Sequence, residues 1–279
     1  MTAAEAFRQR WRRRDKPAMI SVHRGLWGPA PENSLAAISS ARDYDIIEID
    51  TQIARDGVPV VIHDPDLVRT AGKAMKPRET DHATLVAQCL REGAGGPGAG
   101  PTGERLPTLS DALAAAGPEA FFDIDVKFPA EIEAVAEMLA RTNQQHMGSL
   151  KIDTRTPADI ERLLSLQQCF GLMVMAKVVL PKAGLDHIHN LTKAGVAAAE
   201  LWFNDLGQLS DACTIAGNNM AISTYTLDPV HCCGLSDTRA LSDPEIVWGQ
   251  LLEAGVTIIM TDFAPRLDAY ISTRDRAIY

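Results

Sequence analysis

Short apolar runs alternate with amphipathic stretches along most of the chain. The runs are short and apolar enough to suit strands that are buried on both faces. They lie at 19–22, 46–49, 58–62, 121–124, 150–152, 172–175, 197–201, 220–224 and 256–260. Helical features, such as a capping residue or a proline in the first turn, mark the stretches 33–41, 108–116, 129–141 and 156–166. Strands and helices that alternate in this way predict an α/β protein with a parallel sheet.

The number of strand–helix units predicts a (β/α)₈ TIM barrel. A chain of 279 residues suits one such barrel, which typically has roughly 250 residues. The run at 58–62 follows the turn Arg55-Asp56-Gly57, and Asp-Gly is a strong hairpin signal, so we interpret it as an extra strand that returns along the second strand. We expect one domain over residues 1–279, with the barrel at 18–268. The basic run 8–14 predicts a short, solvated N-terminal helix.

Residues 65–106 interrupt the alternation. We expect no strand there, and the centre, at 93–101, is so rich in glycine that it predicts a flexible loop. A long loop within a barrel is usually functional, for example as an active-site lid. We therefore interpret 65–106 as a loop-rich insertion that covers the active site.

Charge and composition narrow the choice of partners. The net charge is −9, whereas nucleic-acid binding usually requires a basic surplus, so we expect no nucleic-acid partner. No segment has the length and apolar character of a membrane span. The five cysteines are scattered and lack zinc-site spacing, and no apolar core of a secretory signal precedes residue 17, which together predict a reduced, cytoplasmic protein. The sequence leaves a homo-oligomer open.

Polar side chains gather where the first strands end, and barrel enzymes place their active sites at that rim. They are His23, Arg24, Glu48, Asp50, His63, Asp125 and Lys127. Glu48 and Asp50 are two residues apart on one strand, so both point the same way and their repulsion needs compensation. A Mg²⁺ or Ca²⁺ ion that also binds Asp125 would supply it, but so would a salt-bridge layer with Lys127 or Arg24. The carboxylates alone do not decide between these two interpretations.

Two histidines at neighbouring strand ends favour a catalytic site. His23 and His63 can act as general acid and general base beside the carboxylates. Arg24 and Lys127 add positive charge, and the planar fork of an arginine suits phosphate oxygens. A metal ion with these cations would stabilise a phosphodiester whose negative charge grows in the transition state. The rim residues therefore predict a metal-dependent phosphodiesterase for a small molecule.

The order of short motifs along the chain resembles the glycerophosphodiester phosphodiesterase family. The motifs are His23-Arg24-Gly25, Glu32-Asn33-Ser34, Glu48-Ile49-Asp50, the run from Asp56-Gly57 to His63-Asp64, Leu106-Pro107-Thr108-Leu109, and the run from Ile258 to Pro265. Together they span about residues 18–268. The resemblance implies hydrolysis of a soluble, glycerophosphodiester-like substrate to a phosphomonoester and an alcohol. It also implies His23 and His63 as acid and base, Glu48 and Asp50 as metal ligands, and Arg24 as a phosphate ligand.

Two positions depart from the family pattern. The family usually has Glu-x-Lys on the third strand, where this chain has Asp125-Val126-Lys127. The shorter aspartate would change how the metal binds and leaves Mn²⁺ as a further choice. A Trp-Thr-Val-Asn run near the seventh strand is replaced by a stretch that contains Tyr225. We expect Tyr225, with Trp202 and Phe203 at the sixth strand end, to line an altered pocket for the alcohol groups.

Three alternatives remain open at this point. One is a phosphodiesterase for a sugar phosphodiester of the agrocinopine type, which the altered pocket motivates. Another is a phospholipase D of the sphingomyelinase type, although those proteins are secreted and disulfide-braced, which the cysteines here do not suggest. The third is a barrel that binds a phosphorylated ligand without catalysis, for which Asp125 is the only support.

Overall fold

The computed structural model describes residues 2–13 and 16–277, and the chain forms two compact units. One unit consists of residues 22–150, and the other combines 1–21 with 151–279. Arg14, the last residue of the basic run, lies outside the described residues. Among the described residues, no helix combines the length and the apolar character that a membrane crossing requires.

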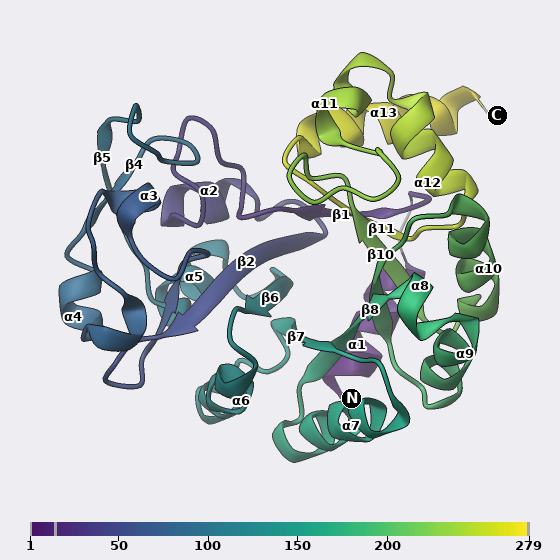
Figure 1. Cartoon of the computed structure of the whole chain (residues 1–279), viewed down its shortest axis with the longest axis horizontal. Helices are drawn as coiled ribbons and strands as arrows, with labels where there is room; N and C mark the ends of the chain where they lie inside the picture. The colour runs from purple at the N-terminus through teal and green to yellow at the C-terminus, as the bar shows by residue number, and fades with distance from the viewer. Residues whose placement is uncertain (1, 14–15, 278–279) are drawn as a thin grey trace. The chain divides into compact units, whose positions relative to one another are not determined.

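The unit of residues 22–150 contains the strand β2 (Figure 1), on which Glu48 and Asp50 lie. β2 (Ile46–Ile53) pairs in parallel with β6 (Phe122–Val126), which pairs in parallel with the first half of β7 (Gly148–Asp153). β3 (Pro59–Val61) returns antiparallel along β2, with Thr51 opposite Val61. The hairpin expected from the Asp-Gly turn is therefore present. This unit also contains α2 (Leu35–Ser40), α5 (Leu109–Ala116), η2 (Pro129–Glu131) and α6 (Ile132–Arg141).

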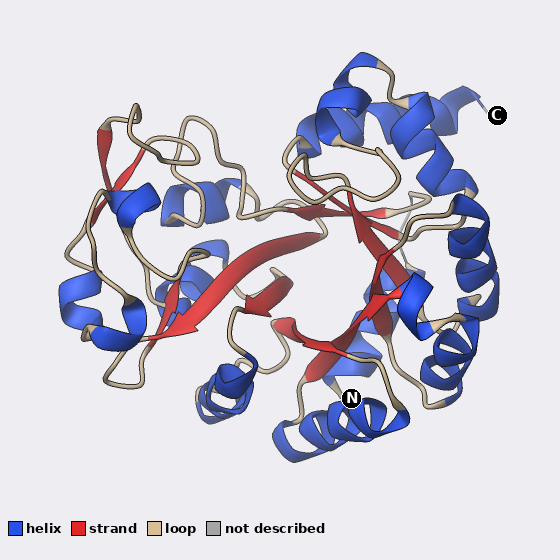
Figure 2. Ribbon diagram, in the orientation of Figure 1, coloured by secondary structure: helices blue, strands red, loops and turns tan. Residues whose placement is uncertain are grey.

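In the other unit, strands neighbour one another in the order β1, β11, β10, β9, β8. Their bounds are β1 Met19–Val22, β8 Met173–Val179, β9 Ala198–Trp202, β10 Ala221–Tyr225 and β11 Ile258–Thr261. β8 to β11 pair in parallel along this order. The helices of this unit, which Figure 2 shows in blue, are α1 Ala3–Arg12, α7 Pro157–Phe170, α8 Leu180–Ala183, α9 Leu185–Lys193, α10 Leu206–Ala216, α11 Asp237–Ser242, η3 Glu245–Gly249, α12 Gln250–Glu253 and α13 Ala264–Ala277.

Local sequence explains where the elements begin. Thr108 and Thr156 each accept a hydrogen bond from the backbone three residues on, in capping boxes that start α5 and α7. The N-terminal helix α1 is present as predicted, but it is not solvated on all sides, because Phe7 and Trp11 are buried on one of its faces. Eight strands with helical segments between them form a (β/α)₈ barrel, which confirms the predicted fold class. The single-domain organisation over 1–279 stays a prediction.

The insertion differs from the loop that we expected. It contains α3 (Val68–Ala71), η1 (Pro77–Glu79), α4 (His82–Leu85) and a two-stranded hairpin of β4 (Cys89–Arg91) and β5 (Pro101–Arg105). Apolar residues of the insertion pack with residues of the β2–β3 hairpin in a cluster that comprises Ala54, Val60, Ile62, Leu67, Leu85, Leu90 and Leu106. The expectation of no strand was wrong, because widely spaced leucines hold the segment together where no periodic pattern marks an element.

Candidate active site

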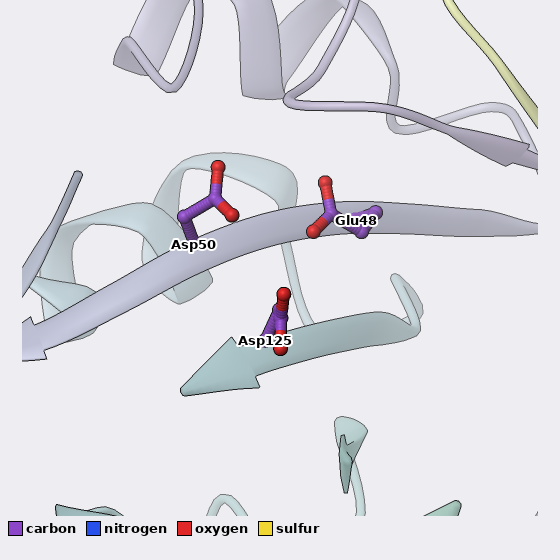
Figure 3. Close-up of side chains that lie close together, drawn as sticks. All are labelled: Glu48, Asp50 and Asp125. Atoms are coloured by element: carbon purple, nitrogen blue, oxygen red, sulfur yellow. The ribbon is translucent and has the colours of Figure 1, made fainter. Parts of the chain in front are cut away.

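The predicted carboxylate cluster is present on two neighbouring strands. Glu48 and Asp50 lie on β2, and Asp125 lies opposite Asp50 on the paired strand β6. Figure 3 shows the three side chains on the same side of these strands. One oxygen from each carboxylate lies within 4.8 Å of the others. Glu48 and Asp50 are buried and Asp125 is partly buried, so the cluster is an all-oxygen group of the kind that Mg²⁺ and Ca²⁺ prefer.

Two cations touch this cluster. Lys127 Nζ lies 2.9 Å from both Asp50 Oδ1 and Asp125 Oδ2. Arg24 Nε lies 3.0 Å from Asp50 Oδ2. Burial opposes ionisation of Asp50, but the charges of Lys127 and Arg24 outweigh it and hold the pKa of Asp50 well below its usual range. The salt-bridge interpretation and the metal interpretation are therefore compatible, since the ion pairs keep Asp50 charged.

The donor set fits a divalent cation. When ionised, Glu48, Asp50 and Asp125 bring three negative charges, against two positive charges on Lys127 and Arg24. Arg24 also pairs with a further carboxylate, as its Nη1 lies 3.0 Å from both oxygens of Glu32. Negative charge thus remains in excess around the cluster, and its oxygens are the ligand type that hard cations require.

A strained loop after β1 places Arg24. Arg24 and Asn33 both have positive φ, of 56° and 57°, which is uncommon outside glycine. Gly25 has φ of 76°, and a Cβ there would lie 2.6 Å from the backbone carbon of Ala37. The His-Arg-Gly motif therefore requires a glycine for steric reasons. The backbone N–H of Arg24 points to the carboxylate cluster, since it donates to Glu48 Oε2 at 3.2 Å.

Each residue of the Glu32-Asn33-Ser34 motif has a distinct contact. Glu32 accepts from Arg24, as described above. Asn33 Nδ2 donates to Asp50 Oδ2 at 2.9 Å, and Asn33 Oδ1 accepts from the Asp50 backbone at 3.3 Å. Ser34, one residue after the start of the predicted stretch 33–41, caps the following helix α2 by accepting from the Ala37 backbone. The motif thus holds Asp50, a candidate metal ligand, in place and begins helix α2.

Each of the two predicted histidines follows a strand of the main sheet. His23 comes directly after β1 and is half-buried. His63 follows β3, and its Nδ1 lies 2.8 Å from Asp64 Oδ1. If Nδ1 carries the proton and donates it to Asp64, then Nε2 is the nitrogen that can exchange a proton with a substrate. The buried Gln52 side chain fixes this strand end, because its Nε2 donates to the carbonyls of His63, at 3.1 Å, and Asp64.

Sequence reasoning missed the part that Arg69 has in this region. Arg69 belongs to α3 of the insertion and contacts both Asp64 and Glu32. Glu32 and Asp64 belong to the family-like motifs Glu32-Asn33-Ser34 and His63-Asp64, but the sequence does not predict what either side chain contacts. Nothing in the spacing of Arg69 separates it from a solvated arginine, because it follows no predicted strand end.

The predicted pocket residues belong to the other unit. Trp202 ends β9 and Tyr225 ends β10, and both are partly buried. Their contact with substrate stays a prediction. Phe203, which we expected to join them, is fully buried, so it contributes to packing and not to a pocket wall.

Comparison with known proteins settles the family. A model of the glycerophosphoryl diester phosphodiesterase family matches residues 23–265, which is most of the chain. The chain belongs to this family. The resemblance that the motifs indicate is therefore confirmed, and the family is one of phosphoric diester hydrolases.

Curated relatives match over shorter stretches. A lysophospholipase D of Mus musculus is 43% identical over 58 residues, which is 20% of this chain and 18% of the relative. A glycerophosphodiester phosphodiesterase of Bacillus subtilis is 30% identical over 134 residues, which is 45% of each protein. The chain thus spans less than half the length of these curated relatives.

Solved structures match over nearly the whole chain. A glycerophosphoryl diester phosphodiesterase of Parabacteroides distasonis has a TM-score of 0.77 at 19% identity, with 98% of this chain and 93% of that chain covered. A phosphodiesterase of Oleispira antarctica, in complex with the product sn-glycerol-3-phosphate, has a TM-score of 0.65 at 19% identity, with 91% and 96% covered. At this identity they establish a shared fold.

Proposed function

We propose that the chain is a metal-dependent phosphodiesterase that hydrolyses a glycerophosphodiester-like molecule to a phosphomonoester and an alcohol. The observation that carries this proposal is the carboxylate cluster of Glu48, Asp50 and Asp125, with Lys127 and Arg24 against it. His63, whose Nδ1 contacts Asp64, follows β3, the strand that pairs antiparallel with β2. Membership of a phosphodiesterase family supports the same reaction class.

The residues have separate roles in this proposal. Glu48, Asp50 and Asp125 would hold one divalent cation, Mg²⁺, Ca²⁺ or Mn²⁺, which when bound supplies Lewis-acid stabilisation of phosphate charge. Arg24 and Lys127, now paired with carboxylates, would share their charge with the phosphodiester oxygens. The positive charges of Arg24 and Lys127 would stabilise the transition state more than the bound substrate, because negative charge on the phosphodiester oxygens grows during the reaction.

His23 and His63 would move the two protons of the reaction. One imidazole takes the proton of the attacking hydroxyl as its oxygen bonds to phosphorus. The hydroxyl belongs to water, or to a neighbouring substrate group, in which case a cyclic phosphate forms and water then opens it to the phosphomonoester. The other imidazole gives a proton to the leaving alcohol oxygen as the P–O bond breaks. The Nδ1 contact of His63 with Asp64 supports this role, since it leaves Nε2 for proton exchange.

A sugar phosphodiester is a second candidate substrate. The specific observations are Asp125 in place of the usual glutamate and Tyr225 at the end of β10. A shorter ligand and a different aromatic residue would change the space beside the phosphate. Trp202 and Tyr225 would then contact the alcohol groups.

Hydrolysis of a small substrate panel tests this proposal. The panel contains glycerophosphocholine, glycerophosphoethanolamine, bis(p-nitrophenyl) phosphate and a sugar–phosphate–sugar diester, each with Mg²⁺, Ca²⁺, Mn²⁺ or EDTA. We expect turnover with at least one metal and none with EDTA, and the best substrate separates the two candidates. Metal-independent ligand binding without turnover of any substrate would contradict the proposal and favour a binding protein.

We further propose a cytoplasmic location, a small-molecule phosphodiester as the substrate and no nucleic-acid partner. All five cysteines are free, and the net charge of −9 disfavours nucleic acid. The insertion at 65–106 is proposed to cover the site, since Arg69 within it reaches residues next to His63 and Arg24.

A further inference from the structure

We propose that Arg69 is a positioning residue that acts on His63 through Asp64, and that the glycine-rich segment 93–96 holds Arg69 in place. This inference rests on the proposed proton-transfer role of His63. It assigns a function to the insertion that goes beyond covering the site.

The guanidinium of Arg69 holds Asp64 with two nitrogens. Nε donates to Asp64 Oδ2 at 2.7 Å, and Nη2 donates to Asp64 Oδ1 at 2.9 Å. Such a fork fixes the plane of a carboxylate as well as its position. Nη2 also donates to Glu32 Oε1 at 2.7 Å, so the guanidinium is itself held from a second side.

Asp64 passes this orientation to the imidazole. Its Oδ1 accepts from Arg69 and also lies 2.8 Å from His63 Nδ1. The hydrogen bonds from Arg69 hold the pKa of Asp64 down at about 2, so the carboxylate is ionised and can only accept. An acceptor there places the imidazole proton on Nδ1 and fixes the ring orientation. Without Arg69, Asp64 could rotate away, and the imidazole would lose its fixed tautomer.

The glycine-rich segment 93–96 is hydrogen-bonded to both the backbone carbonyl and the guanidinium of Arg69. The Gly96 backbone N–H donates to the Arg69 carbonyl at 2.8 Å, and Arg69 Nη1 donates to the Ala94 carbonyl. The same segment binds the second partner of Arg69, because the Glu32 backbone N–H donates to the Gly93 carbonyl at 2.9 Å. This segment is therefore a structured support, and its contacts converge on one side chain.

A glycine is required where the support touches Arg69. Gly95 has φ of +74°, and a Cβ there would lie 2.4 Å from the Arg69 carbonyl oxygen. Gly98, in the same loop, has nothing within 4 Å of such a Cβ. The steric constraint thus lies at the contact with Arg69 and does not extend along the whole loop.

The test compares Arg69→Gln with Arg105→Gln, a matched control. Arg105 is in the same insertion and bonds a carbonyl, that of Ala87, at 2.7 Å. For Arg69→Gln we expect kcat to fall about 10- to 100-fold, as for other residues that orient an active-site group. KM and the metal concentration for half-maximal activity should stay near wild type, and Arg69→Lys should recover part of kcat. Arg105→Gln should match wild type in all of these.

A spectroscopic readout separates positioning from mere stability. In protein labelled with ¹⁵N-histidine, the His63 resonances are identified by their loss in His63→Asn. We expect wild type to show His63 neutral with its proton on Nδ1, and Arg69→Gln to show a mixture of tautomers. A proton on Nε2 in wild type would overturn the inference even if the variant failed to fold.

Two results distinguish this inference from the proposed function. If His63→Asn keeps its turnover, the proposed acid–base pair is wrong and this inference fails with it. If His63→Asn is inactive while Arg69→Gln keeps both wild-type kcat and the Nδ1 tautomer, the proposed function stands and only the positioning role is overturned.

Discussion

The buried charge of Asp50 persists because several partners hold it. Asp50 is 1% exposed, yet it contacts Lys127, Arg24 and Asn33. A buried carboxylate without such partners would lower the free energy of unfolding by several kcal/mol. Removing Lys127 or Arg24 alone should therefore destabilise the site more than replacing Asp50 and both cations together. The same residue thus serves as a candidate metal ligand and as the centre of the local ion-pair network.

Asp237 is a buried carboxylate of the other unit and makes a testable contribution to stability. It accepts from Thr261 Oγ1 at 2.6 Å and from the Asp262 backbone at 2.9 Å, and it also accepts from Thr226. Burial raises the pKa of Asp237 from 3.8 to about 6 despite these hydrogen bonds. A folded-state pKa that is raised gives stability that is complete below the unfolded value and is lost as pH rises through about 6.

The expected result is a pH-dependent gap between wild type and Asp237→Asn. From about pH 4 to about pH 7, the wild type should lose roughly 2–3 kcal/mol of unfolding free energy that the variant does not lose, since one pKa unit corresponds to about 1.4 kcal/mol. Urea denaturation of both proteins across this range measures the gap. A gap that is constant with pH would show that Asp237 has the same pKa in the folded and unfolded states.

At the scale of elements, the insertion differs most from what its sequence indicates. Its glycine content predicts a flexible loop, but β4 and β5 pair with each other, and the segment 93–96 between them is hydrogen-bonded to Arg69 and Glu32. Glycine has two opposite uses that composition cannot separate: it provides flexibility, and it allows close backbone approach at positive φ. Gly95 illustrates the second use.

Two glycine substitutions test this account of the insertion. Gly95→Ala should reproduce the kcat loss of Arg69→Gln, because its Cβ would displace the segment from the Arg69 carbonyl. Gly98→Ala, where a Cβ meets nothing, should leave kcat unchanged. Steady-state kinetics of both variants, with thermal unfolding to confirm folding, provides the measurement. Equal activities would mean that the segment does not position Arg69.

At the scale of the whole molecule, the strands were predicted well from hydrophobic runs. β1 has the predicted bounds, and β2, β9 and β11 differ only at their ends, because buried parallel strands are short and apolar. The insertion could not be predicted in this way. Its elements are brief and its leucines are far apart in sequence, so they form a cluster only after the chain folds.

The candidate site likewise contains residues that the strand pattern predicts and residues that it does not. Glu48, Asp50, Asp125 and Lys127 could be placed together because strand ends in a parallel sheet meet at one rim. Arg69 and the contacts of Glu32 could not, since they depend on a fold within the insertion. Strand pattern thus predicts the residues proposed for chemistry, whereas the residues that orient them depend on tertiary contacts.

The most direct test of the proposed function is the turnover of His23→Asn and His63→Asn, at saturating metal, on the best substrate of the panel. If the two imidazoles transfer the protons, kcat of each variant should fall about 10²- to 10⁴-fold while metal binding is kept. Near wild-type turnover in either variant would contradict the assignment of that histidine and with it the proposed acid–base pair.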